Sequence, residues 1–199
     1  MIIEVDEYKN KIKNYDPKRS EDFHVESAKL ADIDFKKQLK TQKHKRIVFM
    51  AGGTASGKTE FAHTYLTKNN ILVYDGTLKN YDGFKTKLDK IKRYSKNKPT
   101  VKVILIIPKS IYLSLGAFLK RERKMKINTF FETQIKSKLV VAQILTDTKF
   151  RVDIYVSSIG EGKLKFSKLA NDAKRKYRAN FLLRLADIIH SIAVKNNIE

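Results

Sequence analysis

Cysteine is absent from this chain of 199 residues, and this absence excludes both a disulfide framework and a thiolate metal site. The four histidines, at positions 24, 44, 63 and 190, lack the paired spacing of motifs such as H-E-x-x-H. No apolar run approaches the roughly 20 residues of a membrane-spanning helix. The start, Met1 to Glu4, has neither the basic residues nor the apolar stretch of a signal peptide. We therefore expect a cytoplasmic protein with no membrane partner and no resident metal.

Acidic residues are scarce as well. The chain has 21 Asp and Glu against 42 Lys and Arg, so its formal net charge is +21. Such an excess favours anionic partners, whether nucleotide, nucleic acid or an acidic protein. Nucleic-acid binders usually concentrate their charge on one stripe with interleaved aromatics, whereas these lysines are spread along the chain. Composition therefore leaves nucleic acid open as a partner without favouring it.

The strongest pattern lies at residues 46–68. Ile47 to Ala51 form a short apolar run, which is typical of a strand buried on both faces. Residues 52–59 read GGTASGKT and fit G-x-x-x-x-G-K-[ST] at every defined position. Apolar residues at helical spacing follow from Phe61. The order strand, loop, helix is the one that a phosphate-binding P-loop, or Walker A motif, requires.

The chemistry of a nucleoside triphosphate explains this spacing. Glycines let successive backbone N–H groups turn inward around a phosphate, and the helix N-terminus adds roughly half a positive charge there. Lys58 is expected to reach the β- and γ-phosphates, and the Thr59 hydroxyl to hold Mg²⁺. The alternative is a glycine-rich turn that merely joins a strand to a helix. The predicted ATP-binding residues are Gly52, Gly53, Thr54, Ala55, Ser56, Gly57, Lys58 and Thr59.

A second apolar run, Ile71 to Tyr74, ends in Asp75-Gly76, which is the form of a Walker B strand. A carboxylate at the carboxyl end of a parallel strand lies on the edge where open α/β sheets bind ligands. Asp75 is therefore a candidate either for holding Mg²⁺ through water or for accepting a proton from a substrate hydroxyl. The alternative is a simple turn, because Asp-Gly is also a turn dipeptide.

The remaining periodicity completes an α/β core. Helices are predicted at 20–40, 81–93, 110–122 and 129–145, and further strands at 101–107, 152–156 and 163–166. Ser20 is the predicted N-cap of the first helix, and Thr129-x-x-Glu132 a capping box. In the helix predicted at 129–145, the expected buried face consists of Phe131, Ile135, Leu139, Ala142 and Leu145. The chain would then divide into a helical extension (1–43), a core (44–166) and a C-terminal helix packed on the core (167–199).

These elements predict an α/β fold of the three-layer P-loop NTPase or kinase type, with a mainly parallel sheet of about five strands. Two arginines, Arg121 and Arg123, lie in the basic cluster 120–126 between the predicted helices. Right-handed connections would place that cluster near the carboxyl side of the sheet. Because phosphoryl transfer requires Lys, Arg or Mg²⁺ to neutralise the moving group, both arginines are catalytic candidates. The alternative is a pair of solvated charges at a helix end.

Taken together, residues 46–166 resemble the zeta-toxin family of P-loop kinases. The resemblance depends on AGGTASGKTEF (51–61), ILVYDGTLKN (71–80), YLSLGAFLKRERK (112–124) and INTFFETQI (127–135), with FHVESAKLAD (23–32) contributing less. It implies an ATP-dependent kinase that phosphorylates a hydroxyl of a small molecule. The best-known members act on UDP-N-acetylglucosamine, and antitoxin proteins hold many members inactive.

By position, Gly52 to Thr59 match the family's ATP loop, Asp75 matches its acid-Gly-Thr strand, and Arg121 or Arg123 match its lid arginines. With the motifs, the predicted catalytic residues are Lys58, Asp75, Arg121 and Arg123, and the predicted Mg²⁺ ligands are Thr59 and Asp75. The better-known toxins carry a catalytic Asp on a strand between the P-loop helix and the acid-Gly-Thr strand. Only a few residues separate those elements here, so that strand and its Asp are missing. Either Asp75 takes the base role, or another acid does, or phosphotransfer is impaired. The alternatives to a small-molecule kinase are a polynucleotide or nucleotide kinase, which the +21 charge would serve, and a non-catalytic ATP-binding interaction module.

Overall fold

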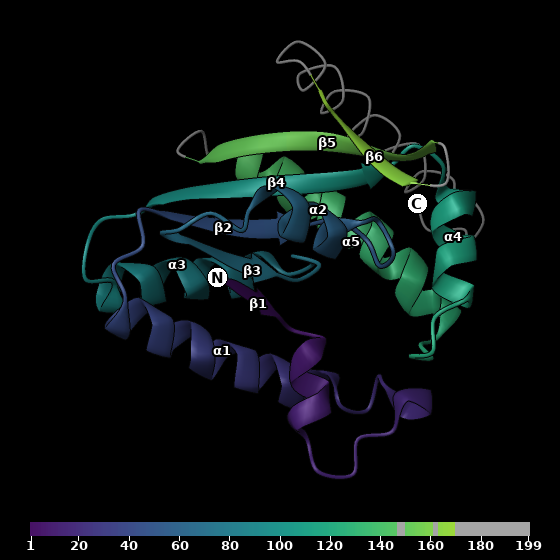
Figure 1. Ribbon diagram of the computed structural model, residues 1–199, viewed down its shortest axis with the longest axis horizontal. Coiled ribbons are helices and arrows are strands. Elements are labelled where there is room, and N and C mark those ends of the chain that lie inside the picture. Colours follow the sequence, from purple (N-terminus) through teal and green to yellow (C-terminus); the bar gives the residue numbers. More distant parts are fainter. Residues whose placement is uncertain (147–149, 161–162, 170–199) are drawn as a thin grey trace, which may run out of the picture. The chain divides into compact units, whose positions relative to one another are not determined.

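The computed structural model describes residues 1–146, 150–160 and 163–169. In these residues the chain forms an α/β fold with one six-stranded sheet and five α-helices (Figure 1). The chain divides into two units, Met1–Ser167 and Lys168–Glu199. All but residues 167–169 of the predicted C-terminal helix (167–199) lies outside the described residues. The strands are β1 (Ile2–Glu4), β2 (Arg46–Ala51), β3 (Ile71–Asp75), β4 (Thr100–Pro108), β5 (Arg151–Gly160) and β6 (Lys163–Lys168). The helices are α1 (His24–Thr41), α2 (Lys58–Tyr65), α3 (Tyr81–Tyr94), α4 (Ile111–Leu119) and α5 (Ile127–Thr146), with short 3₁₀ helices η1 (Glu7–Lys11) and η2 (Pro17–Arg19).

The sheet has the order β1-β3-β2-β4-β5-β6. Strand β2 pairs in parallel with both β3 and β4, while β1 pairs in parallel with β3 and β5 with β4. The prediction of a mainly parallel α/β sheet is therefore confirmed, with six strands instead of about five. Parallel pairing brings the carboxyl ends of β1, β3 and β2 to one edge, where open α/β sheets bind their ligands.

Strand β1 accounts for the additional strand on this side of the sheet. It was expected to belong to a helical extension, yet Ile3 is fully buried and pairs with Tyr74, while Glu4 pairs with Asp75. The Val5 amide continues the contact by donating to the Asp75 carbonyl at 3.2 Å. Three residues are too few for periodicity to reveal a strand, and β-structure depends on the partner available more than on local preference.

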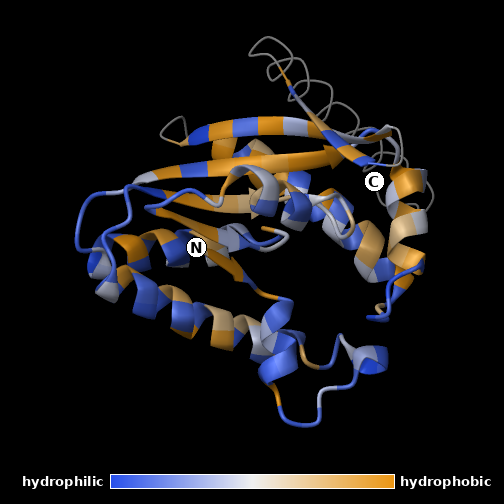
Figure 2. Cartoon of the chain, viewed as in Figure 1, coloured by the Kyte–Doolittle hydropathy of each residue, from blue (hydrophilic) through white to orange (hydrophobic). Residues whose placement is uncertain are grey.

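Hydrophobic side chains pack on both faces of the sheet, and Figure 2 shows apolar residues concentrated along its strands. On one face, Phe61, Ala62 and Leu66, from α2 and the residue after it, cover a cluster that includes Val48 and Met50. On the other face, aromatic rings join the helices to the strands. Phe35 of α1 lies 5.4 Å from Tyr74 and Phe84 of α3 lies 5.3 Å from Phe49, measured between ring centroids. No helix in the described part of the chain is both long and apolar enough to cross a membrane.

Two helix starts differ from the prediction. Helix α1 begins at His24, because Ser20 does not cap it: the Ser20 hydroxyl accepts a hydrogen bond from the buried Lys9 ammonium at 2.9 Å. Helix α5 begins at Ile127, so Thr129 lies within its first turn and the predicted capping box is wrong. The backbone just before α5 is instead bonded by a distant side chain, because the Glu21 carboxylate accepts a hydrogen bond from the Lys126 amide at 2.8 Å.

Candidate phosphate-binding site

The loop that joins β2 to α2, residues 52–59, is here called the GKT loop. Gly57 is the N-cap of α2 with a φ of 90°, a left-handed conformation that favours glycine. Gly52 has a φ of 137°, and a Cβ there would come within 2.5 Å of the Ile106 carbonyl oxygen. These two glycines let the chain turn sharply from the strand into a helix that starts at Lys58.

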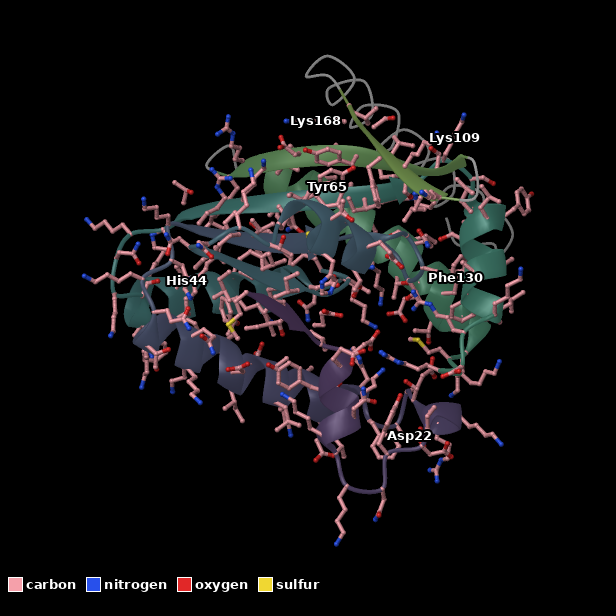
Figure 3. The ribbon with its side chains drawn as sticks, in the orientation of Figure 1. Asp22, His44, Tyr65, Lys109, Phe130 and Lys168 are labelled. Carbon is pink, nitrogen blue, oxygen red and sulfur yellow. The ribbon has the colours of Figure 1, made fainter. Side chains whose placement is uncertain are left out.

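Buried polar side chains of α5 hold the first half of the loop. The Thr133 hydroxyl accepts from the Thr54 amide at 3.0 Å, and the Gln134 amide group donates to the Thr54 carbonyl at 2.9 Å. Phe130, which is labelled in Figure 3, packs on Phe118 of α4 at 5.0 Å between centroids and fixes this turn of α5 beside the loop.

This contact explains why two residues of the predicted buried face of α5 are exposed, although Ala142 of that face is buried as predicted. Phe131 and Ile135 are 44% and 47% exposed, whereas Thr133, Gln134 and Ser137 are buried. A helix that supports a loop of backbone polar groups must offer hydrogen bonds, because an unpaired buried amide is costly. The helical spacing of Thr133, Gln134 and Ser137 could have indicated this contact, but a search for apolar periodicity does not detect polar residues.

Two further hydroxyls hold the second half of the GKT loop. Ser114 of α4 donates to the Ala55 carbonyl at 2.6 Å, and Ser157 of β5 donates to the Ser56 carbonyl at 2.8 Å. The loop carbonyls are thus satisfied from three separate elements. None of these supporting residues was predicted from the sequence, because each contact joins positions more than fifty residues apart.

Lys58, Thr59 and Asp75 come together at the start of α2. The Lys58 ammonium is buried and donates to the Gly53 carbonyl at 2.8 Å, so it lies over the loop. The Thr59 hydroxyl donates to Asp75 Oδ2 at 2.6 Å. Burial lowers the pKa of Lys58 and raises the pKa of Asp75, while the attraction between the two opposes both shifts.

The second oxygen of Asp75 is the feature of this site that best fits a bound cation. Asp75 is only 6% exposed, and its Oδ1 has no hydrogen-bond partner among the described residues. A buried carboxylate oxygen without a partner is expensive, and with the Thr59 hydroxyl it offers oxygen ligands that suit Mg²⁺. The described residues contain no group of three or more His, Cys, Asp or Glu placed to hold a metal. A divalent cation would therefore take most of its ligands from phosphate and water, as Mg²⁺ commonly does.

A cavity of about 670 Å³ opens in front of these residues. The GKT loop and Asp75 form one wall, and the segments around residues 4–7, 24–28 and 76–87 form others. Of the predicted site residues, Thr54, Ala55, Lys58, Thr59, Asp75, Arg121 and Arg123 line the cavity, whereas Gly52, Gly53, Ser56 and Gly57 do not.

The two predicted arginines have different surroundings. Arg123 pairs with Glu7 and lies 3.9 Å from Asp6. Burial lowers the pKa of Arg123, but these two carboxylates outweigh it and keep the pKa above its ordinary value. Arg121 forms no ion pair within the described part of the chain. Its charge lowers the pKa of Lys58, so the two cations share one electrostatic environment.

No family model and no curated protein matches this chain. The assignment of a function therefore depends on the geometry of the site and on the sequence motifs within it. The sequence identified the loop, Asp75 and the arginines. It did not identify the acidic wall formed by Glu4, Asp6 and Glu7, because that wall exists only once β1 has joined the sheet.

Proposed function

We propose that this protein is an ATP-dependent phosphotransferase that transfers the γ-phosphate of Mg·ATP to a hydroxyl of a small molecule. The observation that carries the proposal is the convergence of Lys58, the Thr59–Asp75 pair and Arg121 on one cavity at the carboxyl edge of a parallel sheet. The zeta-toxin-like segments support the same reaction, and a UDP-sugar is the acceptor class that this resemblance implies.

Each residue has a role that its surroundings support. The amides of the first turn of α2 have no partner within the helix and point toward its N-terminal end, where a phosphate can accept from them. Lys58 already spans the loop and would exchange the Gly53 carbonyl for phosphate oxygens. Mg²⁺, when bound, would neutralise charge on the β- and γ-phosphates, with Thr59 and the free Asp75 oxygen on its protein side.

Arg121 is the arginine that we assign to the transferred phosphoryl group. It lines the cavity without a carboxylate partner among the described residues, so its charge is available to the substrate. Arg123 is held by Glu7 and Asp6 instead. Further bonds join this segment to the N-terminal region: the Lys124 amide donates to the Pro17 carbonyl at 2.9 Å, and the Lys126 amide to Glu21. We infer that Arg123 fixes the segment and that Arg121 acts on the substrate.

The acceptor is better matched to a small hydroxyl compound than to a polynucleotide. Although the whole chain carries a charge of +21, Glu4, Asp6 and Glu7 line the cavity together with its cations, so the cavity lacks the uniformly positive surface that a polynucleotide favours. A steep fall of activity with added salt on an RNA substrate would favour the polynucleotide alternative. The cytoplasmic location and an antitoxin partner stay predictions.

Lys58→Ala tests the proposal. The variant should keep the melting temperature of the wild type or exceed it, because it removes a buried charge, and should lose turnover of Mg·ATP. Turnover that survives in a folded Lys58→Ala protein contradicts the assignment. Incubation with γ-labelled ATP and a metabolite extract then identifies the acceptor. Binding of Mg·ATP without transfer to any compound would indicate the non-catalytic module.

A further inference from the structure

A kinase of this kind needs a carboxylate that can take the proton of the acceptor hydroxyl, and Asp75 is poorly suited to that task. Its side chain is 6% exposed, and one oxygen already accepts from Thr59. Its remaining oxygen is buried and has no hydrogen-bond partner among the described residues, so it is poorly exposed to an acceptor in the cavity. The base must therefore be another carboxylate that faces the cavity.

Strand β1 brings further carboxylates to the same edge of the sheet. It runs parallel to β3 with Glu4 opposite Asp75, and the Val5 amide bonds to the Asp75 carbonyl. The chain then continues through Asp6 into η1. Asp6 lines the cavity, and its side chain is 46% exposed.

The three acids of this segment differ in what binds them. Glu4 is occupied by His63, whose Nε2 lies 2.6 Å from the carboxylate. Glu7 is occupied by Arg123. Asp6 Oδ1 pairs with Lys9 at 2.8 Å, but its Oδ2 lies 3.9 Å from the nearest guanidinium nitrogen of Arg123, beyond hydrogen-bonding range. Building on the proposed kinase function, we propose that Asp6 is the catalytic base that accepts the proton of the acceptor hydroxyl.

Lys9 would act as the positioning residue for this base. Its side chain is 1% exposed, and its ammonium holds both Asp6 Oδ1 and the Ser20 hydroxyl. One carboxylate oxygen is therefore fixed, while Oδ2 lies beyond hydrogen-bonding range of Arg123. The cations that act on Asp6 include Lys9 from η1, Arg123 from the segment after α4, and His24 from α1. Lys58 of α2 and Asp75 of β3 also interact electrostatically with it. Burial raises the pKa of Asp6, but the cations outweigh it and leave the pKa below its ordinary value, so Asp6 is ionised at neutral pH.

The proposed step balances with Mg·ATP as the only co-substrate. The acceptor oxygen forms a bond to the γ-phosphorus as its proton moves to Asp6 Oδ2. The bond from the γ-phosphorus to the β–γ bridging oxygen breaks, and its electron pair leaves with ADP. Asp6 later returns the proton to solvent through its exposed side.

The test compares Asp6→Asn with Glu4→Gln, a second carboxylate of the same segment that lines the same cavity. Two quantities are measured: the rate of phosphate release from Mg·ATP, with water as the acceptor, and the dissociation constant of Mg·ATP. Asp6→Asn should lower kcat by about 10²- to 10⁴-fold, the usual contribution of a general base, and leave the dissociation constant within about twofold. Glu4→Gln should lower kcat at least about tenfold less than Asp6→Asn does, because Glu4 is held by His63 and is not placed to take the proton. An Asp6→Asn protein with the kcat of the wild type overturns the proposal, as does an equal loss in Glu4→Gln.

Removal of the Asp6 charge leaves Lys9 buried with fewer partners, so the variant needs a folding control. The double variant Asp6→Asn/Lys9→Met removes both charges and should recover any lost melting temperature without recovering kcat. Recovery of kcat in the double variant would mean that Asp6 serves only to neutralise Lys9, and would overturn the proposal.

Lys9→Met alone tests the role of Asp6 through the pH dependence of kcat, which would not shift if Asp6 had only a structural role. Because Lys9 holds the pKa of Asp6 down, its loss should shift the acidic limb of the kcat profile to higher pH. An unshifted limb contradicts the role of Asp6. A wild-type protein that neither binds nor turns over Mg·ATP overturns the proposed function itself. If the wild type turns over Mg·ATP and the Asp6→Asn variant does so at the same rate, only the assignment of Asp6 as the base is overturned.

Discussion

Replacement of Thr133 by Val tests whether α5 holds the GKT loop. The change removes one hydroxyl and keeps the branched shape of the side chain. That hydroxyl accepts from the Thr54 amide at 3.0 Å and donates to the Phe130 carbonyl at 2.9 Å. Thr133 is 2% exposed and Thr54 is 6% exposed, so water cannot replace the lost acceptor.

The expected magnitude follows from the buried amide. An N–H group left without an acceptor in the interior costs about 1–3 kcal/mol. The substitution opens no cavity, because valine fills the same space, so no further cost is added. The free energy of unfolding should fall by about 1–3 kcal/mol, which for a chain of this size lowers the melting temperature by about 2–4 °C per kcal/mol.

Urea denaturation of the wild type, Thr133→Val and a control gives the result. The control is Thr86→Val, the same substitution on α3, where the exposed hydroxyl bonds only to its own helix at the Asp82 carbonyl. It should change stability by no more than about 0.5 kcal/mol. The affinity for Mg·ATP should also weaken in Thr133→Val alone. Equal stability of the two variants would refute the claim that α5 supports the loop.

Three further predictions concern the loop, Asp75 and Arg121. Gly52→Ala should lower the free energy of unfolding by about 2 kcal/mol or more, because Gly52 has a left-handed φ and a Cβ there would contact the Ile106 carbonyl. The control is Gly116→Ala, where a Cβ would meet nothing within 4 Å. It should raise the free energy of unfolding by about 0.5–1 kcal/mol in the same urea experiment. Asp75→Asn should be more stable than the wild type at pH 7 without Mg²⁺. Burial raises the pKa of Asp75 in the folded protein above its unfolded value of 3.8. The wild type therefore loses stability as the pH rises from 3.8 through the folded pKa. The stability gained by Asp75→Asn should accordingly shrink when denaturation is repeated toward pH 3.8. Arg121→Ala should lower kcat for Mg·ATP by about 10²-fold without a matching loss of affinity, and an equal loss of both quantities would assign Arg121 to binding alone.

Local patterns were enough to predict the central part of the fold. The apolar runs at β2, β3 and β4 predict buried strands because strands covered on both faces need apolar residues at every position. The eight residues of the GKT loop are contiguous, so their backbone requirements can be read along the chain. Asp75 follows from the same logic, since it ends a buried strand.

Other features depend on contacts between distant segments and have no local signature. Strand β1 is three residues long and becomes a strand only beside β3. The buried face of α5 includes Thr133, Gln134 and Ser137, in the part of the helix that meets the loop, so a search for an apolar stripe misses these residues. Arg121 and Arg123 are equivalent in sequence, and only the acids of the N-terminal segment make them different.

The residue pattern alone predicts a parallel α/β sheet, a glycine-rich turn into a helix, and an acid at the end of the neighbouring strand. Tertiary structure decided which acids and cations face one another, because a carboxylate acquires a role from the charges within a few ångströms of it. Asp75 is buried and bonded to Thr59, whereas Asp6 is half-exposed and pairs with Lys9. This difference arises because β1 pairs with β3, about seventy positions away in the chain.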